Sequence, residues 1–107
     1  MDARELIEER LGKLGALGSP DQIRDFFVEK RVTGQAGHSG SCVVARYLLR
    51  EMRASNLLHV SYFAVNSGGI TFRTGASAVD ATFIKVVGPV SDLICAFDEH
   101  QYPELEE

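Results

Sequence analysis

The chain has 107 residues and a mass of 11.7 kDa, a length that predicts one domain covering residues 1–107. It is too short for a TIM barrel, for an α/β-hydrolase, or for a dinucleotide-binding domain with a separate substrate domain. Its 45% hydrophobic and 24% charged residues and its net charge of −4 are ordinary for a globular protein and argue against global disorder.

Charge is unevenly distributed along the chain. Residues 38–88 carry a net charge of +3, whereas residues 89–107 contain six acidic side chains and neither lysine nor arginine. A terminus of this composition is typical of a solvated segment, so we expect residues 103–107 to form a disordered acidic tail. We find no secretory signal pattern, no membrane-spanning run and no paired cysteine spacing. We therefore expect a cytoplasmic protein that does not engage a membrane.

Two helices are predicted at the start of the chain. Residues 1–18 form a helical N-terminal segment, in which Asp2 and Glu5 have capping-box spacing and apolar residues follow at intervals of three and four. The second helix begins after Ser19, because a serine can cap the helix and Pro20 suits its first turn.

A third helix is predicted after a glycine-rich loop. Ser41 or Ser39 can cap it, and it extends to about Ala54. Apolar residues occupy one broad arc of this helix, and Glu51 falls inside that arc, where a carboxylate requires a partner. The opposite arc carries three arginines: Arg46, Arg50 and Arg53.

Three strands and a last helix are predicted in the second half of the chain. Residues 57–65, 70–74 and 81–87 are rich in apolar, aromatic and β-branched side chains, and residues 66–69 have the composition of a hairpin turn. Pro89 opens the last helix. The order predicts an α+β fold with three N-terminal helices, a three-stranded antiparallel sheet and a C-terminal helix.

Several short motifs resemble those of a group of small uncharacterised proteins of actinobacteria and their phages. That group shares Thr-Gly-Val, then Ser-Cys-Pro-x-Ala-x-Tyr-Leu, then Phe-Asp followed by Tyr-Pro-x-Leu. The counterparts here are Thr33-Gly34, Ser-Cys-Val-Val-Ala-Arg-Tyr-Leu at 41–48, Phe97-Asp98, and Tyr-Pro-Glu-Leu at 102–105. Val43 replaces the proline of the pattern and Gln35 replaces its valine. The resemblance spans residues 20–105 and implies an actinobacterial or phage origin and one compact domain. No activity is established for the group, so the resemblance assigns no site residue.

The first predicted strand has apolar side chains on both faces. Leu58, Val60, Tyr62 and Ala64 alternate on one face, and Leu57, Phe63 and Val65 occupy the other. If the helices cover only one face, a protein partner or a second copy of the chain must cover the other, unless the last helix does so. Our leading interpretation is therefore a non-enzymatic regulatory or adaptor domain that acts through protein–protein interaction.

An alternative interpretation is a winged-helix protein that binds nucleic acid. Arg46, Arg50 and Arg53 would lie on the recognition helix, and Arg73 would sit close to the hairpin turn. The net charge of −4, the acidic C-terminal region and the long loop before the third helix argue against this interpretation.

A third interpretation is a small papain-like thiol hydrolase that uses Cys42 and His59. A cysteine in the first helical position, capped by Ser41, would have a stabilised thiolate, and an imidazole on the next strand could take its proton. The competing interpretation is a packed free thiol. Neither Cys-x₂-Cys nor His-x₃-His spacing occurs, so we expect no metal and no cofactor.

Overall fold

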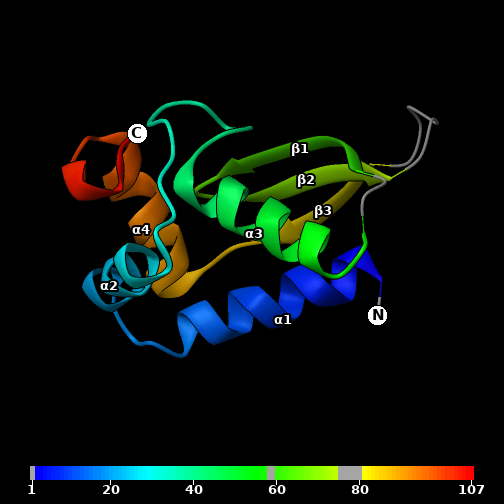
Figure 1. The fold of residues 1–107 in the computed structure, drawn as a ribbon, viewed down its shortest axis with the longest axis horizontal. Coiled ribbons are helices and arrows are strands. Elements are labelled where there is room, and N and C mark those ends of the chain that lie inside the picture. Colours follow the sequence, from blue (N-terminus) through cyan, green and yellow to red (C-terminus); the bar gives the residue numbers. More distant parts are fainter. Residues whose placement is uncertain (1, 58–59, 75–80) are drawn as a thin grey trace.

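The structure is a computed structural model, and it describes residues 2–57, 60–74 and 81–107. Three helices, a three-stranded antiparallel sheet and a fourth helix follow one another in the described chain, which confirms the predicted α+β order (Figure 1). The elements are α1 (Ala3–Gly15), α2 (Pro20–Lys30), α3 (Val43–Ala54), β1 (Val60–Asn66), β2 (Gly69–Thr74), β3 (Ala81–Lys85), α4 (Gly88–Asp98) and the 3₁₀ helix η1 (Pro103–Leu105).

The first two helices begin as their sequences predict. The Asp2 carboxylate accepts a hydrogen bond from the Glu5 amide at 2.8 Å, and the Ser19 hydroxyl accepts one from the Gln22 amide at 3.2 Å. Each side chain satisfies an amide that has no partner within its own helix.

The start of α3 differs from the prediction. Cys42 is the N-cap, and its Sγ accepts a hydrogen bond from the Ala45 amide at 3.4 Å. Ser41 instead pairs with Gln35, both through its hydroxyl, which donates at 2.9 Å, and through its carbonyl, which accepts at 2.8 Å. The Ser39 carbonyl accepts from the amide of Val65 on β1. The two serines therefore hold the loop in place rather than capping the helix.

The register of the sheet determines which residues share a face. Phe63 and Val65 lie opposite Phe72 and Ile70 and face the helices, while Tyr62 and Ala64 lie on the other face. An irregularity of register between Val60 and Tyr62 turns Val60 toward the core. The prediction that Val60 shares a face with Tyr62 and Ala64 is therefore wrong, and Leu58 lies outside the described residues.

The hydrophobic core lies between the sheet and the helices. In Figure 1, α3 crosses the sheet, α1 lies along the same side, and α2 and α4 pack together at one end of the sheet. The core combines α1, α2, α3, β2 and α4, with Ile7, Phe27, Leu48, Ile70 and Phe97 all fully buried. The described helices include none that is both long enough and apolar enough to cross a membrane.

The predicted disordered tail at 103–107 is ordered. Leu105 is fully buried, and the backbone of Gly34 pairs with this segment through the carbonyl of Leu105 and the amide of Glu107, both at 2.9 Å. The acidic composition of this segment led to the wrong prediction of disorder, because one apolar side chain and two backbone hydrogen bonds hold the segment against the domain.

Candidate functional site

The predicted arginine row on α3 is partly engaged within the chain. Arg46 pairs with Glu107 at 2.9 Å, and this guanidinium lowers the pKa of the Glu107 carboxyl. Arg50 donates through Nη1 to the carbonyl of Lys30 at the end of α2, also at 2.9 Å, while Arg53 is exposed. The row therefore helps to hold α2 and the C-terminal segment against α3.

The arrangement of α2 and α3 differs from that of a helix-turn-helix. Residues 31–42 separate the two helices, whereas a helix-turn-helix uses a turn of about 3–4 residues. α2 packs mainly against α4. Arg73 lies at the end of β2 away from the 66–69 turn, so the expectation that it sits close to this turn is wrong. These contacts give the nucleic-acid interpretation no particular support.

Cys42 lies in an environment that disfavours a thiolate. Its side chain is 2% exposed, and this burial raises the pKa of the thiol. A nucleophilic cysteine requires the opposite shift and an accessible sulfur. His59, the imidazole expected to accept the proton, lies outside the described residues.

The segments around Gly34, at the start of α3 and around Leu105 meet in three dimensions. A side chain at Gly34 would overlap the backbone of Val43 at the start of α3, so only glycine allows this close approach. The same glycine pairs with the segment that contains Leu105, and the Asp98 carboxylate accepts from the Gly37 amide at 3.0 Å. These contacts hold the loop, the start of α3 and the C-terminal segment together.

The outer face of the sheet, defined by Tyr62, Ala64, Thr71, Arg73 and Phe83, is the face directed away from α3, and Phe83 at its edge also borders a hollow lined by residues of α1. Tyr62 is 48% exposed and Phe83 is 56% exposed. The Arg73 guanidinium lies 5.4 Å from the centre of the Tyr62 ring. The sequence left open whether an outside partner or the last helix covers the face of Phe63 and Val65; both side chains pack against the core formed with the helices.

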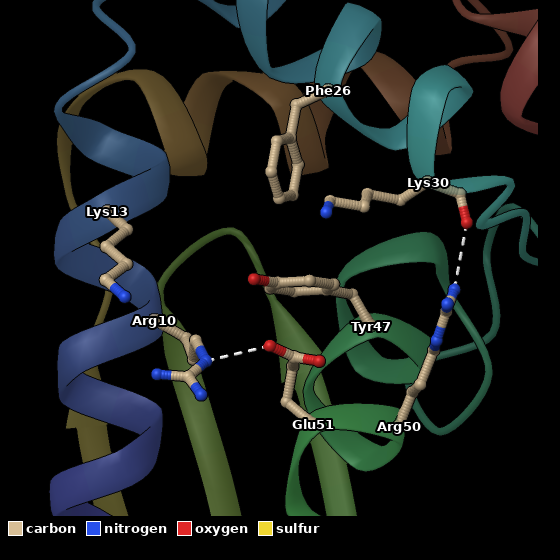
Figure 2. A pocket seen from close by; sticks show the side chains of 7 residues that line it. All are labelled: Arg10, Lys13, Phe26, Lys30, Tyr47, Arg50 and Glu51. Carbon is tan, nitrogen blue, oxygen red and sulfur yellow. Dashed lines mark hydrogen bonds and ion pairs between the residues drawn. The ribbon is translucent and has the colours of Figure 1, made fainter. Parts of the chain in front are cut away.

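The basic pocket, a hollow of about 300 Å³, lies between α1, α2 and α3. Figure 2 shows the side chains that line it: Arg10, Lys13, Phe26, Lys30, Tyr47, Arg50 and Glu51. The sequence singled out Arg50 and Glu51 of this set by their positions on the third helix, and Tyr47 only as part of the motif at 41–48. The others come from separate helices, and no spacing within one helix reveals that they meet. Glu51 finds its partner here, because Arg10 donates to it through Nε at 2.8 Å.

Residues 2–57, 60–74 and 81–107 contain no cluster of three or more histidine, cysteine or carboxylate side chains suited to a metal ion. Comparison of the chain with protein-family models, with curated proteins and with solved structures finds no match.

Proposed function

We propose that this protein is a small non-enzymatic adaptor or regulatory domain that binds a protein partner through the outer face of its sheet. The observation that carries the proposal is the exposure of two large aromatic side chains, Tyr62 and Phe83, on one face of the sheet. Single exposed apolar residues are normal on protein surfaces, but two aromatic residues on a shared face suit an interface.

The composition of the outer face also supports this role. Tyrosine and arginine are enriched among residues that dominate binding energy, and here Arg73 lies beside Tyr62. Phe83 has a structural role as well, because its ring lies over Gly69, where it covers backbone on the outer face. A partner that stacks on this face would bury both rings. The burial of Cys42 supports a binding role over catalysis by this thiol.

The experiment compares substitutions of the two rings with one at an equally exposed apolar residue elsewhere. Sedimentation velocity tests for a dimer, and a photo-crosslinking residue at position 62 or 83 captures any other protein partner from cells. Tyr62→Ser combined with Phe83→Ser should abolish the association. Val28→Ser should not, because Val28 is 50% exposed but lies on α2.

A single partner, or a second copy of the chain, crosslinked at position 62 or 83 but not at position 28 would support the proposal. A monomer that yields no specific crosslink at position 62 or 83 would refute it.

A further inference from the structure

We propose that the basic pocket binds a phosphate monoester whose organic group carries a flat ring. The pocket is formed by α1, α2 and α3 and is separate from the outer face of the sheet, so this inference does not depend on the proposed protein interaction. It rests on the charge, the hydrogen-bond donors and the aromatic walls of the pocket (Figure 2).

The pocket has more positive charge than its own carboxylates neutralise. Four cations line it: Arg10, Lys13, Lys30 and Arg50. Two carboxylates offset them, because Glu51 pairs with Arg10 and Glu9 pairs with Lys13 at 3.4 Å and also with Arg10. Four positive charges against two negative charges leave two positive charges. A phosphate monoester carries about −1.5 to −2 at neutral pH and matches this excess, whereas a carboxylate carries a single charge.

The donors that remain available come from different helices. Within the described residues, neither Lys30 nor Arg50 pairs with a carboxylate. Arg50 uses one nitrogen on the Lys30 carbonyl, and a guanidinium has five N–H donors in all. In Figure 2, the ammonium groups of Lys13 and Lys30 reach from opposite sides toward the same space. Convergent donors of this kind suit an anion with several oxygen atoms.

Two aromatic rings form the apolar part of the pocket. Phe26 and Tyr47 pack edge to face, with ring centroids 5.6 Å apart and an interplanar angle of 86°. The Tyr47 hydroxyl has no hydrogen-bond partner among the described residues, and Figure 2 shows it pointing into the pocket. Burial raises the pKa of this hydroxyl, so it stays protonated and can donate to a ligand. The Lys30 ammonium lies over the Phe26 ring, 5.7 Å from its centre, so a flat ring on the ligand would lie against the aromatic surface beside it, which bare phosphate would leave unused.

Phenyl phosphate is the probe, and its binding is followed by titration with ¹H–¹⁵N NMR spectra. We expect it to bind more tightly than inorganic phosphate, which has no ring, and than benzoate, which has one charge. Lys30→Gln should weaken binding about tenfold, and Tyr47→Phe should weaken it about fivefold, because each removes a donor to the phosphate. Lys85→Gln is the matched control: it removes the same charge from β3 and should change the affinity by less than about twofold.

Thermal unfolding checks that each variant is folded, and Lys13→Gln replaces Lys30→Gln if the latter is unfolded. The absence of saturable binding of phenyl phosphate below about 10 mM would overturn the proposal. An equal loss of affinity for phenyl phosphate in Lys30→Gln and Lys85→Gln would also overturn the proposal, because the effect would then come from the overall charge of the protein. Equal affinities for phenyl phosphate and inorganic phosphate would refute the role of the ring. Phosphotyrosine and a nucleoside monophosphate then distinguish a modified side chain from a free nucleotide, and binding of either supports the site.

Discussion

Cys42 has two roles that explain why it is buried. Its Sγ accepts the Ala45 amide at the start of α3, and its side chain fills part of the core. Sulfur is a weak acceptor, but it combines a cap with an apolar surface, which a serine hydroxyl does less well in a buried position. The residue that looked most reactive in the sequence is therefore explained by helix capping and packing.

This explanation predicts the order in which the two thiols react. Iodoacetamide should label the exposed Cys95 of the native protein first, whereas Cys42 should react only when the protein unfolds. The raised pKa of Cys42 leaves less thiolate at any given pH than an ordinary thiol has. Mass spectrometry of timed samples measures both rates, and a Cys95→Ser variant isolates Cys42. Labelling of native Cys42 faster than an unfolded control would contradict the prediction.

Gly34 shows how a loop residue positions a helix. It lies between the start of α3 and the C-terminal segment, and its amide and carbonyl both pair with the latter. A side chain here would push α3 away from its neighbours, because the obstructing atoms are backbone and cannot rotate aside.

We therefore expect Gly34→Ala to lower the free energy of unfolding by roughly 2–4 kcal/mol. Gly12→Ala is the control, since Gly12 lies within α1 with open space around its Cα. For Gly12→Ala we expect the free energy of unfolding to rise by about 0.5–1 kcal/mol, because alanine has the higher helix propensity. Urea denaturation of the two variants measures the difference, and similar stabilities would contradict the close approach of Gly34 to α3.

At the scale of the whole molecule, the C-terminal segment closes the domain. Leu105 is fully buried, η1 contacts α2, and the Tyr102 hydroxyl donates to Asp21 at 2.8 Å. The acidic residues around Leu105 face outward or pair with cations, as Arg24 does with Glu104. The C-terminal segment thus exposes charged side chains to solvent while Leu105 holds it against the core.

Leu105→Ala should therefore lower the free energy of unfolding by about 2–4 kcal/mol, the cost of a cavity in the core. Glu104→Ala should change it by less than about 1 kcal/mol, because its pair with Arg24 is near the surface. Thermal or urea denaturation compares the two variants. Equal, small effects would show that the segment does not pack against the domain in solution.

Local sequence determined the secondary structure of this protein. Caps such as Ser19, the apolar periodicity of the helices and the turn at 66–69 act over a few residues, so their effects can be read without knowing the fold. The outer face was only partly predictable, because the irregularity of register before Tyr62 changes which residues share a face. The sequence placed three arginines on the third helix, but it did not reveal that Arg46 pairs with Glu107 and that Arg50 donates to the Lys30 carbonyl.

Three other features of this protein depend on its tertiary structure. It placed Cys42 rather than Ser41 at the cap of α3, anchored the C-terminal segment through Leu105, and assembled the basic pocket from three helices. Each of these features depends on residues far apart in the sequence. Their burial and pairing follow from how the helices pack, which the pattern along any one helix does not specify.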